Sequence, residues 1–348
     1  MEIAFYVHHH GSGHLMRCLA IASALKNCHI TFLGSRLETQ KSLIPTSIDL
    51  ISLPMDTPND EDHDPLDQSL EGLHYAPLNI SGQLQRVDRI TSFLANHPKL
   101  LFIVDVSVEI AMLSRLCGVP TIVVMQHGLR ADLPHQICYR NAVGLLAPFD
   151  ERMSGQVPEW INRKTFYTGG LSRFAPGADT SDASKKQVAV LIGSGGTSID
   201  EQFLGYLSSQ CPQWTFHILG NSQQSSNGNN LHFHGKLNDP QAVLANCCLV
   251  IGNAGHNTVM ECASLNKRFI AIAEKRPFAE QEEKARIIEE LGLAIHISAA
   301  EILHVDWKEM LEKLLSTQPN WTGFISSDAA ERAAGYLIAT HRTIFKPN

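Results

Sequence analysis

The stretch "GNAGHNTVMECASLNKRFIAIAEKRPFAEQEEKARIIEELG" (residues 252–292) decides the fold of this chain. Apolar runs at 249–252, 268–273 and 293–297 predict short buried strands, and helical patterns at 255–265 and 280–291 fill the intervals between them. Strands that alternate with helices are typical of a parallel sheet with helices on both faces. The stretch therefore predicts part of a Rossmann-like domain.

The same alternation continues toward both ends of the chain. Residues 166–186, rich in Gly, Ser, Asp and Pro, interrupt it and predict a connection between two domains. We expect a Rossmann-like N-terminal domain at 1–168, a linker at 169–186, and a Rossmann-like C-terminal domain at 187–348 whose last helix packs back on the first domain. The other predicted strands are 2–7, 29–34, 49–54, 100–105, 120–125, 144–149, 187–193, 214–220 and 231–235, and the other predicted helices are 14–26, 80–96, 107–117, 199–209, 239–247, 306–316 and 327–342.

Composition narrows the classes of function. The 348 residues are 44% apolar and 18% charged, with a formal net charge of −7, as expected for a soluble globular protein of about two domains. An acidic chain is a poor general binder of nucleic acid, and no apolar run approaches the roughly 20 residues of a membrane helix. The chain shows no signal-peptide pattern, and its eight cysteines form no CxxC pair. These features favour a cytoplasmic protein with reduced thiols and no zinc; contact with a membrane surface stays open.

A glycine-rich turn, "GSGH" at 11–14, follows the first predicted strand and opens a helix. Such a turn lets the backbone approach a ligand, and the helix N-terminus attracts an anion; an ordinary tight turn is the competing interpretation. The helix dipole disfavours the imidazolium form of His14, which is our first candidate for a general base. His9 or His10 is a candidate for positioning the acceptor or the sugar. The candidate donor contacts in this turn are Gly11, Ser12 and Gly13.

The second half supplies a matching turn, "LIGSGGTS" at 191–198, again between a strand and a helix. Backbone amides and hydroxyls in such a turn suit a phosphate, and no GK[ST] follows that would make it a Walker motif. Its candidate phosphate contacts are Ser194, Gly195, Gly196 and Thr197.

The third group of candidates lies within 252–292. Residues 253–256 cap a predicted helix, and Glu261 on that helix carries a carboxylate that can accept hydrogen bonds from ribose hydroxyls. Glu280 and Gln281 begin the next helix. A capped helix with solvated acidic residues is the competing interpretation. The donor-side candidates here are Asn253, Gly255, His256, Asn257, Glu261, Glu280 and Gln281.

Polar residues also follow predicted strands of the first half, where open α/β sheets bind their ligands. A histidine in such a place is often a hydrogen-bonded structural residue, so no single member of this group stands out. Asp105 and His127 are further candidates for the catalytic base, and the acceptor-side candidates are His74, Glu109, Arg130 and Asp132.

Together these motifs resemble the MurG-like family 28 glycosyltransferases. AGxxTxxE at 254–261 resembles their donor signature, GSGGT at 193–197 and GSGH at 11–14 resemble their two glycine-rich turns, and GGLSR at 169–173 resembles their Gly-x-x-x-Arg linker. The resemblance covers nearly the whole chain. It implies a GT-B fold, in which two Rossmann-like domains face a central cleft, with the acceptor side in the first domain and a nucleotide-sugar bound by the second. It also favours uridine as the base, Glu261 as the ribose ligand, and His14 at the reacting centre.

Glycosyl transfer requires that the leaving diphosphate be stabilised. The DxD-like segment "DEDHD" at 60–64 lies in a long acidic loop of the first half, where a solvated loop is the expectation. Two helix N-termini that face each other can hold the diphosphate charge instead, and Arg173 in the linker adds a cation. We therefore expect no metal and no cofactor, and a single base-assisted displacement that inverts the anomeric centre.

Departures from the family leave other activities open. "GHLMRCLAIA" at 13–22 is closer to a nucleotide-sugar hydrolase of pseudaminic acid synthesis, which has the same fold and transfers the sugar to water. The Asp-His-Tyr signature of that hydrolase is replaced here by VDVSVE at 104–109. The leading interpretation is a glycosyltransferase whose acceptor is a glycan, a lipid-linked molecule or a small molecule. The alternatives are the hydrolase, a nonhydrolysing epimerase, and a nucleotide-sugar-binding protein without catalysis.

Overall fold

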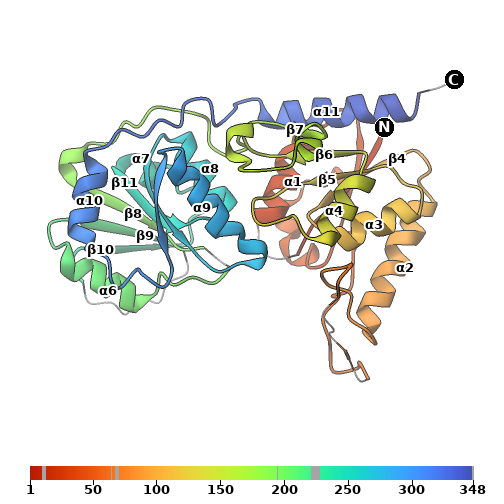
Figure 1. Cartoon of the computed structure of the whole chain (residues 1–348), viewed down its shortest axis with the longest axis horizontal. Coiled ribbons are helices and arrows are strands. Elements are labelled where there is room, and N and C mark those ends of the chain that lie inside the picture. Colours follow the sequence, from red (N-terminus) through yellow and green to blue (C-terminus); the bar gives the residue numbers. More distant parts are fainter. Residues whose placement is uncertain (10–12, 64, 67–69, 194, 221–227, 347–348) are drawn as a thin grey trace.

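Two parallel β-sheets, one in each half of the chain, organise the protein (Figure 1). The structure is a computed structural model that describes residues 1–346 except 10–12, 64, 67–69, 194 and 221–227. No helix among the described residues is both long enough and apolar enough to cross a membrane.

The first sheet has seven strands in the order β3-β2-β1-β4-β5-β6-β7, all paired in parallel. Its strands are β1 (Glu2–Tyr6), β2 (His29–Gly34), β3 (Ile48–Ser52), β4 (Leu100–Asp105), β5 (Thr121–Val124), β6 (Gly144–Ala147) and β7 (Thr165–Tyr167). The helices of this half are α1 (Gly13–Ala24), α2 (Ser81–Ala95), α3 (Val108–Leu116), α4 (Leu133–Asn141) and α5 (Glu159–Asn162), with 3-10 turns η1 (Glu38–Leu43) and η2 (Glu151–Met153).

The second sheet has six parallel strands in the order β10-β9-β8-β11-β12-β13. Its strands are β8 (Gln187–Leu191), β9 (Thr215–Leu219), β10 (Leu231–Gly235), β11 (Leu249–Asn253), β12 (Arg268–Ala273) and β13 (Ala294–Ser298). The helices are α6 (Glu201–Gln210), α7 (Gln241–Asn246), α8 (His256–Ser264), α9 (Glu280–Glu290), α10 (Trp307–Leu315) and α11 (Ala329–Ile344), with 3-10 turns η3 (Ala183–Lys185) and η4 (Pro277–Ala279).

One strand and two α-helices of the first half, β7, α4 and the four-residue α5, were absent from the prediction. Strand β7 spans three residues, Thr165–Tyr167, and is too short to show a periodic pattern. Helix α4 spans nine residues, and its mixture of polar and apolar residues hides its period. Its start could have been predicted, because Asp132 caps it and Pro134 lies in its first turn.

The final helix, α11, returns to the first half of the chain and lies along it (Figure 1). It packs against α1. The Tyr336 ring stacks on Phe166 with ring centroids 4.6 Å apart, and the Nε2 atom of His341 lies 2.9 Å from the Lys99 carbonyl. The last helix therefore belongs to the layer that supports the N-terminal sheet.

Two connecting segments, residues 168–186 and 316–328, join the halves and pair with each other. Gly170 and Ile325 form a parallel bridge, and the Gly170 amide donates a hydrogen bond of 2.7 Å to the Phe324 carbonyl. A Cβ atom at Gly170 would lie 2.6 Å from that carbonyl oxygen, so the close approach requires glycine there.

The carboxyl ends of the two sheets face each other. Gly13, which follows β1, lies close enough to Asn257, which follows β11, that an added Cβ would be 3.5 Å from the Asn257 amide nitrogen. The amide of Leu129, which follows β5, donates a hydrogen bond of 2.7 Å to the carbonyl of Phe278, which follows β12. Since ligands of open α/β sheets bind at these strand ends, the region between the sheets is where we look for a site.

Candidate active site between the two sheets

A buried cluster of three side chains joins helix α1 to strand β4. The Nδ1 atom of His14 lies 2.6 Å from Oδ2 of Asp105, and the Arg17 guanidinium donates to the other oxygen of Asp105. Asp105 and Arg17 are both buried, whereas His14 is partly exposed. The sequence placed His14 and Asp105 in the same site, and the structure brings them into direct contact.

The proton positions in this cluster follow from charge and geometry. Burial alone would raise the pKa of Asp105, but the charge of Arg17 and the contacts with His14 outweigh it and hold that pKa well below its usual range. Nδ1 of His14 also lies 3.1 Å from Nη2 of Arg17. An ionised carboxylate can only accept hydrogen bonds, so the shorter contact of 2.6 Å to Asp105 requires the proton on Nδ1, and Arg17 then makes no hydrogen bond to that nitrogen. The other ring nitrogen of His14, Nε2, then keeps its lone pair and can accept a proton.

The backbone beside Asp105 is strained. Val106 has a φ angle of 61°, which is unfavourable for a β-branched residue, and the Ser107 amide bonds back to the Asp105 carbonyl at 2.9 Å. Such conformations cost about 1–3 kcal/mol and persist where the surroundings enforce them. The sharp turn ends β4 at the carboxylate that contacts His14.

On the donor side, helix α8 begins with Gly255 as its N-cap residue, which offers no capping side chain to the first amides of the helix. Gly193 faces this helix start, because a Cβ there would lie 3.4 Å from Oδ1 of Asn253. That oxygen is buried and has no hydrogen-bond partner among the described residues. The uncapped first amides of α8 suit an anion, whereas Oδ1 of Asn253 can only accept and so suits a hydroxyl or N–H donor of a ligand.

One carboxylate that the sequence analysis did not single out fixes this turn. Oε1 of Glu274, at the end of β12, accepts hydrogen bonds from the amide and hydroxyl of Ser198 at 2.5 and 2.8 Å and from Nδ2 of Asn253 at 3.0 Å. Arg276 lies over the turn and donates to the Gly196 carbonyl at 2.5 Å. Thr197 accepts the Ile199 amide at 3.0 Å, which orders the end of the turn.

Glu261 is buried on α8 and is held by the linker arginine. Nε of Arg173 donates to Oε1 of Glu261 at 2.8 Å, and Nη1 donates to the Asn238 carbonyl at 3.0 Å. Burial raises the pKa of Glu261, and the Arg173 charge limits the shift. Arg173 therefore positions the predicted ribose ligand, whereas we had expected it to add a cation for the phosphates.

Glu280 and Gln281 begin α9, as predicted. Each makes a hydrogen bond to another residue of the C-terminal half. Glu280 accepts a hydrogen bond of 2.6 Å from the fully buried Lys284, whose charge outweighs burial and lowers the pKa of Glu280 to about 2. Oε1 of Gln281 accepts the Glu274 amide at 3.1 Å. The sequence analysis missed Lys284, although Glu-to-Lys spacing of four residues on a helix is a recognisable signal.

Two imidazoles lie between the halves, the buried His127 after β5 and the partly exposed His256 at the start of α8. Burial, reinforced by the charge of Lys284, lowers the pKa of His127 to about 3 and that of His256 well below its ordinary value. The Nε2 atoms of both residues are buried without a hydrogen-bond partner in the described part of the chain. Both imidazoles are therefore neutral at pH 7, and each has one polar atom available to a ligand.

The acceptor-side candidates form a hydrogen-bonded network. His74 and His135 lie 3.0 and 2.7 Å from the two oxygens of Asp132, and Arg130 lies 2.7 Å from Nε2 of His135. Burial opposes the ionisation of Asp132, but the bonds from His135 and His74 outweigh it and lower the pKa to about 2. Glu109 accepts the backbone amides of residues 74 and 75 at 2.7 and 3.1 Å.

His74, Asp132 and His135 also have the residue types of a metal site, with their ligand atoms within 4.8 Å of one another. Hydrogen bonds account for the close approach of these three side chains without a bound cation. Since Arg130 can only donate, Nε2 of His135 is the acceptor and its Nδ1 carries the proton that Asp132 accepts. A cation here would also meet the positive charge of Arg130.

Asp62, in the acidic segment at 60–64, caps the start of helix α2. Asp62 accepts the amide of Ser81 at the start of α2 at 2.8 Å and the amide of Asn59 at 2.9 Å. Asp64 lies outside the described residues, as do four predicted contacts of the glycine-rich turns: His10, Gly11, Ser12 and Ser194.

Comparisons with known proteins agree with this architecture. Residues 187–333 match the model of the glycosyltransferase family 28 C-terminal domain. A comparison with curated protein sequences gave no match.

Solved glycosyltransferase structures are similar to the whole chain. A UDP-glucosyltransferase from Polygonum tinctorium is 14% identical with a TM-score of 0.69, and the comparison covers 98% of each chain. MurG of Acinetobacter baumannii is 14% identical with a TM-score of 0.59, covering 99% of each chain. The spinosyn rhamnosyltransferase SpnG is 12% identical with a TM-score of 0.62, covering 99% of this chain and 96% of the other. The predicted GT-B fold is confirmed, and the predicted resemblance to family 28 is borne out for residues 187–333.

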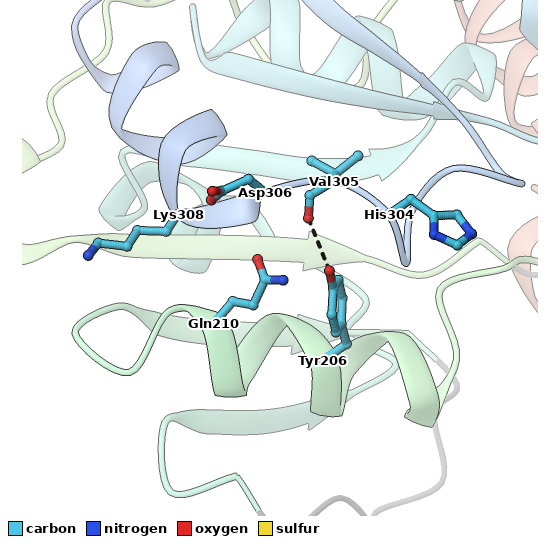
Figure 2. Close-up of a pocket in the computed structure, with 6 residues that line it drawn as sticks. All are labelled: Tyr206, Gln210, His304, Val305, Asp306 and Lys308. Atoms are coloured by element: carbon cyan, nitrogen blue, oxygen red, sulfur yellow. Dashed lines mark hydrogen bonds between the residues drawn. The ribbon is translucent and has the colours of Figure 1, made fainter.

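A cavity of about 330 Å³ opens elsewhere on the C-terminal half, between α6 and the start of α10 (Figure 2). Three of its polar side chains already contact the start of α10 or the residue before it. Tyr206 donates to the Val305 carbonyl at 3.3 Å, Gln210 accepts the Trp307 amide at 2.9 Å, and Asp306 caps α10. We therefore assign the chemistry to the strand ends between the sheets.

Proposed function

We propose that this protein is a glycosyltransferase that transfers a sugar from a nucleotide-sugar, with UDP as the favoured nucleotide, and that it does so by inversion without a metal. The observation that carries the proposal is the His14–Asp105 contact at the start of α1, opposite the start of α8, whose N-cap is a glycine. A general base and an anion site that face each other across one gap are the two parts that glycosyl transfer needs.

Similar structures support a nucleoside diphosphate donor. The Polygonum tinctorium protein is a UDP-glucosyltransferase, and SpnG is complexed with thymidine diphosphate. In this chain Arg173 contacts Glu261, and we propose that Glu261 exchanges part of this contact to accept hydrogen bonds from ribose hydroxyls. We infer a nucleoside diphosphate sugar and favour UDP because of the family resemblance.

The proposed reaction is a single displacement. Nε2 of His14 takes the proton of an acceptor hydroxyl while the acceptor oxygen bonds to the anomeric carbon and the bond to the diphosphate oxygen breaks. The diphosphate leaves with the electron pair of that bond, and the first amides of α8 and the 193–197 turn stabilise its charge. Asp105 stabilises the imidazolium that forms at His14.

Metal independence rests on the groups around the anion site. Glu274 is committed to Ser198 and Asn253, and Glu280 is committed to Lys284. Asp132 is likewise saturated by two imidazoles. These carboxylates thus have partners that a cation would have to displace, while helix amides supply the positive potential.

The deciding experiment incubates the purified protein with a panel of nucleotide-sugars, with and without candidate acceptors, and measures nucleotide release and sugar products. Release of nucleotide with transfer to an acceptor supports the proposal. Free sugar without any acceptor indicates a hydrolase, and binding without turnover indicates a binding protein.

His14→Ala then tests the base. We expect turnover to fall by about 10²–10⁴, with nucleotide affinity nearly unchanged because the anion site and Glu261 remain. A thermal unfolding midpoint close to the wild-type value shows that the fold is retained. Normal turnover, or a loss of nucleotide binding in step with rate, would assign His14 a structural or phosphate-binding role.

A further inference from the structure

The loop between β12 and α9, residues 274–279, reaches across to the N-terminal half of the chain. Phe278 and Ala279 have φ angles of 60° and 51°, so two successive residues other than glycine adopt left-handed backbone conformations. Each such residue costs free energy and persists only where its surroundings hold it. The loop is therefore kept in this shape by its contacts, which come from the other half of the chain.

Three side chains of the N-terminal half surround the Phe278 ring. The ring centroids of His74 and His135 lie 4.6 and 4.8 Å from that of Phe278, and the His135 contact is edge-on at 86°. The Arg130 guanidinium lies 5.1 Å from the ring centroid, within the range of a cation–π interaction. Asp132 holds both imidazoles in these orientations.

The backbone completes the contact. The Leu129 amide donates 2.7 Å to the Phe278 carbonyl. Gly128 has a φ of 118°, and a Cβ there would lie 2.6 Å from the same carbonyl oxygen, so this approach requires glycine. Contacts to the Phe278 ring and a hydrogen bond to the Phe278 carbonyl thus both hold this residue against the N-terminal half.

We propose that Phe278 is a latch that fixes the 274–279 loop to the N-terminal domain and so sets the position of Glu280 and Gln281 when the two domains close. The inference rests on the proposed function in assigning Glu280 and Gln281 to the donor sugar. The sequence analysis considered His74, Arg130 and Asp132 as acceptor-side residues. On this proposal they and His135 instead bind the Phe278 side chain and thereby position the donor side of the site.

The Phe278 contact links closure of the two domains to the position of the proposed donor ligands. Glu280 and Gln281, which follow Phe278 within three residues, are bonded within the C-terminal half, so they would move away from His14 together with that half once Phe278 is released. Closure in turn excludes water from His14, which favours transfer to an acceptor over hydrolysis. Phe278 itself is a positioning residue, because it acts through the residues that follow it.

The test measures the distance between domains by electron spin resonance. Cys117 is exposed in the N-terminal half, Cys28 is partly exposed, and the other six cysteines are buried. Spin labels on Cys117 and on Ser209→Cys, a substitution on the exposed face of α6, in a Cys28→Ser background report the domain separation without any ligand. Phe278→Ala should broaden the distribution of distances between the two labels and shift it to longer values. The same measurement is then repeated with UDP present.

Conservative and neighbouring variants make the test specific. Phe278→Tyr keeps the ring and should restore the wild-type distribution. Leu129→Ala removes an exposed side chain but keeps the amide that bonds to Phe278, and should also behave as wild type. Hydrogen exchange of the Leu129 amide should accelerate by about tenfold or more in Phe278→Ala alone.

An unchanged distance distribution and unchanged Leu129 exchange in Phe278→Ala, with a retained unfolding midpoint, would overturn the latch. Both readouts work on the free protein. Failure of the nucleotide-sugar panel would therefore count against the proposed function and leave the latch to be decided by the distances.

Discussion

The Asp105–Arg17 pair gives the sharpest test of how this site is built. Asp105 is 0% exposed and Arg17 4% exposed, and Asp105 also accepts the proton on Nδ1 of His14. Asp105→Asn removes the negative charge that compensates the Arg17 guanidinium in this contact. Removing one partner of a buried ion pair typically costs about 3–5 kcal/mol, which urea unfolding at neutral pH would measure.

The same substitution should change the tautomer of His14. Arg17 can only donate, so in Asp105→Asn it selects the carbonyl oxygen of the new amide and turns the NH₂ group toward His14. Nδ1 must then accept, Nε2 takes the proton, and the base is lost, with turnover reduced by about 10²–10⁴. Long-range ¹H–¹⁵N spectra of the imidazoles at pH 7.5, assigned with His14→Gln, report the tautomer without a substrate.

A double variant separates stability from catalysis. Arg17→Met with Asp105→Asn removes both buried charges, so most of the lost stability should return. The amide introduced at position 105 is then free to turn its oxygen to Nδ1, and the original tautomer should reappear with part of the activity. A wild-type protein whose His14 carries its proton on Nε2, or a double variant less stable than Asp105→Asn, would refute this reasoning.

Three further outcomes are expected. Glu261→Ala should weaken UDP binding by about 1–3 kcal/mol in calorimetry, as for a lost charge-assisted hydrogen bond, and unchanged affinity would remove Glu261 from the ribose site. Activity in excess chelator should equal activity with added magnesium or manganese, and a loss that metal restores would contradict the metal-independent mechanism. The pKa of folded His127 is about 3, whereas unfolded His127 binds a proton near 6.5. Stability should therefore fall as pH drops from 6.5 to 5, and the slope in His127→Asn should be smaller by up to about 1.4 kcal/mol per pH unit in urea titrations; equal slopes would show that His127 is not buried as a neutral imidazole.

Hydrophobic patterning predicted the sheets because buried parallel strands are continuous apolar runs. The run at 268–273 coincides with β12, and residues 29–34 coincide with β2. Strand β7 was missed because three residues carry no period, and α4 because Asp132 was considered as a site residue and not as a helix cap.

The site was predictable where one motif contained both its residues and their context. His14 opens a helix after a glycine-rich turn, and Arg17 could have been added because it lies one turn further on the same face. The role of Phe278 depends on residues 74, 130 and 135, which approach it only through tertiary folding. Arg173 was assigned to the phosphates because its place in the chain is readable from the motif, whereas the direction of its side chain is not.

The paired connections at Gly170 and Ile325 determine how enzymes of this architecture can be recombined. Because α11 supports α1, the helix that carries His14, the first domain is made of the two ends of the chain. Grafting a new C-terminal domain onto this N-terminal domain by one crossover near residue 180 would replace α11 with a foreign helix against α1, the helix of His14. A chimera that exchanges residues 187–316 keeps α11 packed on α1 and keeps the native pairing of Gly170 with Ile325. Residues 187–316 are therefore the segment to exchange when donor preference is to be changed.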